Sequence, residues 1–154
     1  MTTYNLLDTA AMADADVTAI TDLDSASNGS RRADFFARRF TAQKNNPDAF
    51  VSMTASDGDT LVGFASCHLL QGEFGTDQLT AVLDALAVEP GSQGHGIGHG
   101  LLAELLSELR TRGAQELRTQ AVWNQPALLD FFADTGFELA PRLILERSTR
   151  DVQF

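Results

Sequence analysis

The feature that most constrains this chain is an apolar strand that leads through a glycine-rich loop into a long amphipathic helix. Residues 79–88 are apolar on both alternating faces, which predicts a central strand buried on both sides. Glycine then stands at every second position from 94 to 100, and from Ile97 apolar residues recur four apart, as in a helix. Glycine lets N–H groups turn toward a ligand, and the helix start adds unpaired N–H groups. The segment therefore predicts an anion site that suits phosphate.

Two familiar phosphate-binding loops do not fit this segment. The P-loop needs Gly-Lys-Ser or Gly-Lys-Thr, and the only lysine of the chain, Lys44, lies elsewhere. The dinucleotide fingerprint needs Gly-x-Gly-x-x-Gly, and its third glycine would fall on His99 or Leu101. A nucleotide-binding oxidoreductase is therefore disfavoured. The spacing that remains is Gln93-x-x-Gly96-x-Gly98.

Composition narrows the class of protein. The 154 residues are 44% hydrophobic and 21% charged, and the net charge is −10. An acidic chain is a poor partner for nucleic acid and for anionic membranes, because both attract basic surfaces. No apolar run approaches the ~20 residues of a membrane span, residues 1–7 carry no secretory signal, and Cys67 has no second cysteine to pair with. We expect one domain over residues 1–154, cytoplasmic, that binds neither nucleic acid nor membrane.

The other segments predict a mixed α/β (α+β) chain. A helical pattern covers residues 14–23, and a loop is expected over 25–30. Ser30 can cap a second helix that runs to about residue 43. A last short helix is expected between Asn124, as its cap, and Gly136. Strand patterns cover 3–7, 50–55, 61–70, 79–88, 117–123 and 143–145. This order predicts a mixed sheet with helices on both faces.

Two motifs together resemble the GCN5-related N-acetyltransferase superfamily. The first is the Gln93-x-x-Gly96-x-Gly98 loop after the buried strand, and the second is the segment from Asn124 to Gly136-Phe137. The order of elements is also similar, and the good match covers roughly residues 79–146. The resemblance implies the acyl-CoA N-acyltransferase fold, with a mixed, mostly antiparallel central sheet of six to seven strands.

The resemblance also implies acetyl-CoA as co-substrate. Its pantetheine arm would pair with the strand at Leu86, Ala87 and Val88, in a V-shaped gap beside residues 117–123. Asn124 would hydrogen-bond the arm, and Phe131 and Phe132 would wall its thiol end. The pyrophosphate would lie on the amides of Gln93, Gly94, His95, Gly96, Ile97 and Gly98.

The activity that the resemblance implies is direct transfer of an acetyl group to a primary amine of a small molecule or peptide in a ternary complex. Many family members carry a tyrosine four residues before the glycine of Gly-Phe, where it protonates the leaving thiolate. Phe132 stands there in this chain. The alternative function is therefore an acetyl-CoA-binding sensor or partner module without turnover. A homodimer through the last strands would suit the family.

Some candidate side chains have two interpretations. Asp84 interrupts the apolar strand where some family members place an acid that faces the acceptor amine, so it is the candidate general base; the alternative is a structural carboxylate.

His68 is expected to be buried with its hydrogen bonds satisfied, or else to face the acceptor cleft. His95 and His99 lack a third ligand nearby, so we expect no metal. Four arginines are expected to form a solvated helix face, with the alternative that one binds an acidic acceptor: Arg31, Arg32, Arg38 and Arg39.

Overall fold

The computed structural model describes residues 1–7, 14–121, 125–150 and 153. The chain forms two compact units, residues 1–120 and residues 121–154. The expectation of a single domain over 1–154 stays a prediction. The first unit holds the sheet and three long helices, and the second holds one short helix and the segment after it.

The first unit is built on a five-stranded sheet in which the strands lie in sequence order. The pairings from β1 to β4 are antiparallel, and β4 pairs with β5 in parallel. The sheet is therefore mixed and mostly antiparallel, as predicted. Its strands are β1 (Thr2–Leu6), β2 (Phe50–Asp57), β3 (Thr60–Gln71), β4 (Leu79–Val88) and β5 (Glu116–Arg118).

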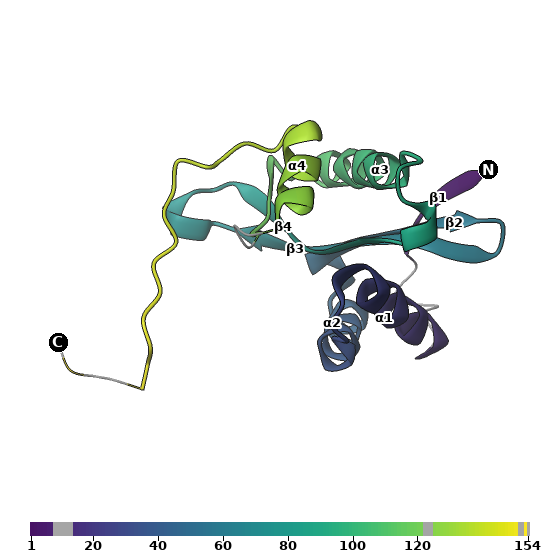
Figure 1. The fold of residues 1–154 in the computed structure, drawn as a ribbon. Helices are drawn as coiled ribbons and strands as arrows, with labels where there is room; N and C mark the ends of the chain where they lie inside the picture. Colours follow the sequence, from purple (N-terminus) through teal and green to yellow (C-terminus); the bar gives the residue numbers. More distant parts are fainter. Residues whose placement is uncertain (8–13, 122–124, 151–152, 154) are drawn as a thin grey trace. The chain divides into compact units, whose positions relative to one another are not determined.

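Helices cover both faces of this sheet (Figure 1). Helices α1 (Asp14–Asn28) and α2 (Ala33–Asn45) lie on one face, where Phe36 and Phe40 pack around Phe64 of β3 at ring-centroid distances of 6.0 and 5.9 Å. Helix α3 (Ile97–Thr111) lies on the other face, and its residue Ile97 approaches Gly63 of β3. Adjacent residues of β3 thus contact opposite helical layers, as the period of a strand requires. The predicted fold class is confirmed.

The α1–α2 connection differs from the prediction. The segment 25–28 is helical rather than a loop, and α1 ends only before Gly29, which has a φ of +78°. The last turn is held by Asn28, whose side-chain amide donates to Asp24 Oδ1 at 2.7 Å. Ser30 does not cap α2, since that helix starts after Arg32 and its N-cap makes no side-chain hydrogen bond. Local composition favours a loop, but the side-chain contacts of Asp24 outweigh it.

In the second unit, helix α4 (Pro126–Asp134) ends before Gly136, whose φ is +90°. The predicted strand over 143–145 is wrong. These residues form no strand, and the side chains of Leu143 and Leu145 are each 89% exposed. A strand is stabilised by pairing, and no strand within the described ranges pairs with this segment. The described sheet consequently has five strands instead of six to seven.

Candidate functional site

The loop between β4 and α3 presents backbone N–H groups at a helix start. Gly94 and Gly96 have left-handed backbones, with φ of +82° and +78°, and a Cβ added at either glycine would meet no atom within 4 Å. The first bond of α3 runs from Gly100 N–H to Gly96 C=O at 3.0 Å. The N–H groups of Gly96, Ile97 and Gly98 precede that bond, so they have no acceptor inside the helix. This geometry fits an anion that lies close to the main chain.

Among the described residues, one edge of β4 carries no strand partner next to this loop, which we call the open edge. β3 pairs with β4 along its whole length, whereas β5 pairs only with Thr80–Val82. In the described ranges no strand pairs with the second edge of residues 83–88. The predicted strand over 117–123 ends at Arg118, and Trp123 lies outside the described residues. The separation of β4 from β5 fits the predicted V-shaped gap.

The open edge offers defined backbone groups. Glu89 N–H donates to Val62 C=O of β3 at 2.8 Å. Because backbone groups alternate in direction along a strand, the N–H and C=O of Ala87 also face β3, while those of Leu86 and Val88 face away from it. The Val88 carbonyl accepts a hydrogen bond from Gln93 Nε2 at 3.2 Å, which ties the loop to the strand. The outward groups of Leu86 and the Val88 N–H remain directed to the open edge. This edge and the loop amides form a row of backbone polar groups that is interrupted at the turn, where the N–H groups of Glu89, Ser92 and Gln93 are already bonded to the carbonyls of Val62, Glu89 and Pro90.

Asp84 lies in an irregularity of the same strand. The register of β4 against β3 passes from Ser66↔Ala85 to Cys67↔Leu83, so Asp84 is the extra residue of a β-bulge. Its Oδ2 lies 2.7 Å from Nδ1 of His68, and its Oδ1 lies 3.4 Å from Nη2 of Arg39. The side chain of Asp84 is 12% exposed, and those of Arg39 and His68 are each 23% exposed. We refer to Arg39, His68 and Asp84 as the acid–base cluster.

The arginines of the α1–α2 region are not all solvated. Arg38 is exposed, as predicted. The prediction is wrong for Arg32 and Arg39, because Arg39 belongs to the acid–base cluster and Arg32 contacts both oxygens of the fully buried Asp24, at 2.9 and 2.6 Å. The hydrogen bonds to Asp24 raise the pKa of Arg32. Arg31 also forms an ion pair, with Asp22, but at an exposed position.

Cys67 does not provide a nucleophile. Its side chain is completely buried, and its neighbour His68 points to the opposite face of β3. Burial, and secondarily the negative charge of Asp84, strongly raise the pKa of the Cys67 thiol. The thiol therefore stays protonated, and a protonated thiol is a poor acyl acceptor.

Glu89 stabilises the turn that leads into the loop, the 3₁₀ segment Pro90–Ser92. Its carboxylate accepts a hydrogen bond from the Ser92 hydroxyl at 2.9 Å. This bond and those from the N–H groups of Gly91 and Ser92 lower the pKa of Glu89. The carboxylate is thus folded back on its own turn. His95 is exposed, and its Nδ1 lies 3.2 Å from the Ser92 carbonyl.

The other predicted contacts lie outside the first unit. Asn124 falls outside the described residues. Phe131 and Phe132 belong to α4 in the second unit, where the ring of Phe132 lies 5.7 Å from that of Phe131 and 4.8 Å from that of Phe137. Phe132 is thus part of an aromatic cluster within its own unit.

Sequence reasoning missed the role of Tyr4. An added Cβ at Gly100 of α3 would overlap the Tyr4 hydroxyl and lie 2.5 Å from its Cζ. Glycine at this position leaves room for the Tyr4 ring of β1, which would have to shift if a Cβ were present. The alternating glycines pointed to Gly100, but nothing in the sequence indicated that Tyr4 lies against it.

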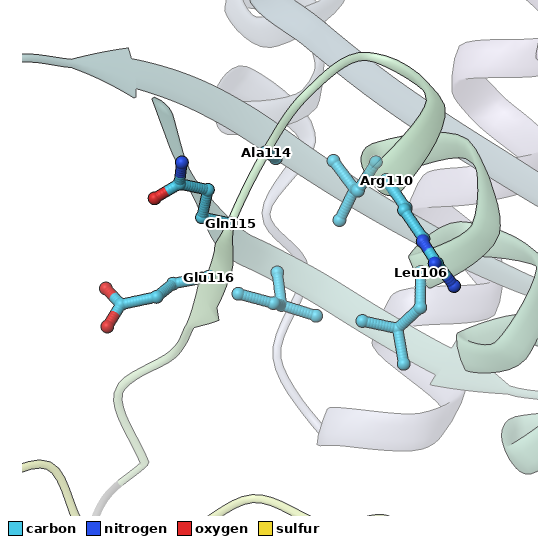
Figure 2. A pocket seen from close by; sticks show the side chains of 7 residues that line it. Leu106, Arg110, Ala114, Gln115 and Glu116 are labelled. Atoms are coloured by element: carbon cyan, nitrogen blue, oxygen red, sulfur yellow. The ribbon is translucent and has the colours of Figure 1, made fainter. Parts of the chain in front are cut away.

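A surface hollow of about 380 Å³ lies away from these groups, between the end of α3 and β5. Figure 2 shows Leu106 and Arg110 on the helix and Gln115 and Glu116 on the other side. No predicted site residue lines it. Its lining residues are Leu106, Leu109, Arg110, Ala114, Gln115, Glu116 and Leu117.

In the part of the chain that the structure describes, no three His, Cys, Asp or Glu side chains are grouped to hold a metal ion. Among the described helices, none has the length and apolar character needed to cross a bilayer.

Sequence comparison identifies a family. The sequence pattern of the acetyltransferase (GNAT) family matches residues 17–137. No curated protein sequence matches the chain.

Solved structures with the same fold include proteins of several kinds. A transcriptional regulator from Bacillus halodurans C-125 is 16% identical with a TM-score of 0.78, over 96% of this chain and 99% of that one. The aminoglycoside N-acetyltransferase AAC(6')-Iy in complex with CoA is 16% identical with a TM-score of 0.78, over 97% and 95%. The ribosomal-protein-S18-alanine N-acetyltransferase from Escherichia coli is 21% identical with a TM-score of 0.71, over 91% and 79%.

Proposed function

Because this chain belongs to the acetyltransferase (GNAT) family, we propose that it transfers the acetyl group of acetyl-CoA to a primary amine of a small molecule or peptide. The transfer is direct, within a ternary complex. The observation that carries the proposal is the row of backbone groups that runs from the open edge of β4 to the N–H groups of Gly96–Gly98. A co-substrate with a diphosphate at one end and an amide-bearing arm at the other is complementary to this row.

The residues of the row divide the binding of acetyl-CoA between them. The amides of Gly94–Gly98, at the positive end of α3, hold the pyrophosphate, while Gln93 ties the loop to Val88 and His95 lies beside the phosphates. The outward groups of Leu86 and the N–H of Val88 pair with the amides of the pantetheine arm as an added strand would. Ala87 contributes by packing, since its side chain is 2% exposed in the core. Asn124, Phe131 and Phe132 are proposed to contact the thiol end of the arm.

The chemistry needs positioning and two proton movements. Acetyl-CoA supplies the activated thioester. The acceptor nitrogen attacks its carbonyl carbon, so that a C–N bond forms and the C–S bond breaks, while an outward N–H of β4 donates to the carbonyl oxygen. The attacking nitrogen is the neutral amine, since an ammonium has no lone pair; it loses one proton as the amide forms, and one proton reaches the thiolate from water, as Phe132 carries no hydroxyl to donate. Transfer through an acetylated Cys67 is disfavoured by the burial and protonation of that thiol.

The acceptor end is marked by Asp84 and its two partners, and Asp84 is the base that the sequence predicts. Asp84 is already paired with Arg39, so the net charge of −10 is what favours a cationic amine as acceptor. Two structural neighbours are named for action on an aminoglycoside and on a ribosomal-protein alanine. We therefore propose a cationic amine as acceptor; the aminoglycoside and peptide classes define the panel to be screened.

The experiment that tests this function is thiol release from acetyl-CoA across a panel of aminoglycosides, polyamines and peptides with free N-termini or lysines. The expected result is release of CoA that depends on one class of amine, with a matching mass increase of one acetyl group in the product. The second candidate function is a coenzyme-binding module, which Phe132 favours because the usual hydroxyl is missing. Calorimetric binding of acetyl-CoA without product from any amine would support the module and contradict the enzyme.

A further inference from the structure

Within the acid–base cluster, Asp84 is more fully engaged by its partners than His68 is. Both carboxylate oxygens of Asp84 already face nitrogen atoms, Oδ2 at 2.7 Å from His68 and Oδ1 at 3.4 Å from Arg39. A proton arriving at Asp84 from a substrate would have to displace one of these partners. Asp84 is also the less accessible of the two acid–base groups, with 12% of its side chain exposed against 23% for His68.

His68 is arranged to accept a proton at its second nitrogen. An ionised carboxylate is only an acceptor, so Nδ1 of His68 carries the hydrogen of their short contact. In a neutral imidazole this leaves the lone pair on Nε2, and the carboxylate holds the ring in that tautomer. The ring comes from β3 and the carboxylate from the bulge of β4, so the backbone of the sheet fixes both.

The cluster lies at the correct end of the open edge. Along β4, Asp84 comes first, then Leu86 and Val88 with their outward groups, and then the glycine loop. At ~3.3 Å per residue, Asp84 precedes Val88 by ~13 Å. A co-substrate with its diphosphate on the loop and its arm along Leu86 and Val88 has its thioester directed toward His68 and Asp84.

We propose that Nε2 of His68, oriented by Asp84, accepts the proton that the acceptor nitrogen loses when the C–N bond forms. This rests on the proposed function and gives Asp84 a positioning role in place of the base role predicted from sequence. The imidazole becomes an imidazolium that Asp84 stabilises, and it returns the proton to water after the product leaves. The electron pair of the broken C–S bond stays on sulfur, so no further reactant is needed.

The charged groups that contact His68 or its partner come from β4 and α2. β4 contributes Asp84, α2 contributes Arg39, and the charge of Arg32, just before α2, also interacts with Asp84. Arg32 in turn holds Asp24 of α1. Arg39 is itself fixed over the rings of Phe35 and Phe50, at 5.2 and 5.6 Å from their centroids. The carboxylates of Asp84 and Asp24 are thus each matched by an arginine.

The test is the pH dependence of kcat/KM for the wild type, His68→Gln and Asp84→Asn, with the best amine of the panel. We expect His68→Gln to lower kcat by about 10²–10⁴-fold and to remove the ascending limb of the profile. Asp84→Asn should lower kcat less and keep a displaced limb, because an asparagine carbonyl still accepts from Nδ1. Affinity for acetyl-CoA should be unchanged in both variants. Loss of the limb in Asp84→Asn with its retention in His68→Gln would overturn the proposal and make Asp84 the base.

His99→Gln is the matched control, since His99 is an exposed histidine of α3, and its kcat should equal that of the wild type. The tautomer of His68 is read separately, from imidazole ¹⁵N–¹H NMR spectra of the protein without substrate, where we expect the Nδ1–H form. An Nε2–H form in an active enzyme would overturn this proposal alone. Wild-type protein that acetylates no amine would overturn the proposed function, and this proposal with it.

Discussion

The two ends of the candidate site are built from different parts of the chain. The proposed coenzyme end consists of backbone groups from one continuous segment, β4, its loop and the start of α3. The acceptor end consists of side chains from α2, β3 and β4, which are 16 to 45 positions apart in sequence. The first end needs glycines and an open strand edge, and it tolerates many side chains. The second end depends on how α2, β3 and β4 are placed against one another, so it is sensitive to how α1 and α2 pack.

The largest effect should come from removing the ion pair that holds α1 to the start of α2. Arg32→Ala leaves the carboxylate of Asp24, which is 0% exposed, without its guanidinium partner. We expect a loss of about 3–5 kcal/mol in the free energy of unfolding, measured by urea denaturation. The control is Arg31→Ala, whose pair with Asp22 is exposed, with an expected loss of about 0–1 kcal/mol. Equal losses in the two variants would show that the buried Arg32–Asp24 pair stabilises the α1–α2 packing no more than the exposed Arg31–Asp22 pair does.

The next effect tests the coenzyme end alone. Gly96→Asp places a negative charge and a side chain at the amides that are proposed to hold the pyrophosphate. Like charges in contact cost several kcal/mol, so we expect calorimetric affinity for acetyl-CoA to fall about 100-fold or more. Gly58→Asp is a matched control, because Gly58 also has positive φ, +60°, and no atom within 4 Å of an added Cβ. It lies in the β2–β3 turn and should bind as the wild type does; similar losses in both variants would indicate strain instead of a phosphate site.

The smallest effect concerns the contact between β1 and α3. Gly100→Ala gains about 1 kcal/mol of helix propensity but forces Tyr4 to move, which costs about 1–3 kcal/mol. We expect a net loss of about 1 kcal/mol in stability by urea denaturation. In the Tyr4→Ala background the same change should be neutral or stabilising, which gives a coupling energy of about 1–2 kcal/mol. A coupling near zero would mean that Tyr4 does not determine the need for glycine.

The backbone structure of the proposed coenzyme end was predictable because its signals are local. Residues 79–88 showed a buried strand by their pattern, and β4 has those bounds. Ile97 was predicted as the start of the long helix, and α3 begins there. Gln93, Gly94 and Gly96 were singled out from their spacing, and the structure gives two of them left-handed backbones and the third a bond to Val88. Each of these features depends on residues fewer than twenty positions apart.

The acceptor end was only partly predictable because its partners are distant in sequence. Asp84 was noticed as a polar residue in an apolar strand, but its bulge depends on the register with β3. Arg39 has the pattern of a solvated helix residue, and only the packing of α2 on the sheet brings it to Asp84. Asp24 likewise gave no signal of burial. Long-range ion pairs of this kind leave no periodic trace in a sequence.

The burial of the only cysteine has a practical consequence for kinetics. Cys67 is 0% exposed and its thiol is held protonated, so a thiol-specific chromogenic reagent should react with liberated coenzyme and not with the folded enzyme. Colour formed during turnover then counts product without a protein background. Unfolding the same sample in guanidinium releases one thiol per chain, which gives an internal standard for the number of enzyme molecules in the cuvette.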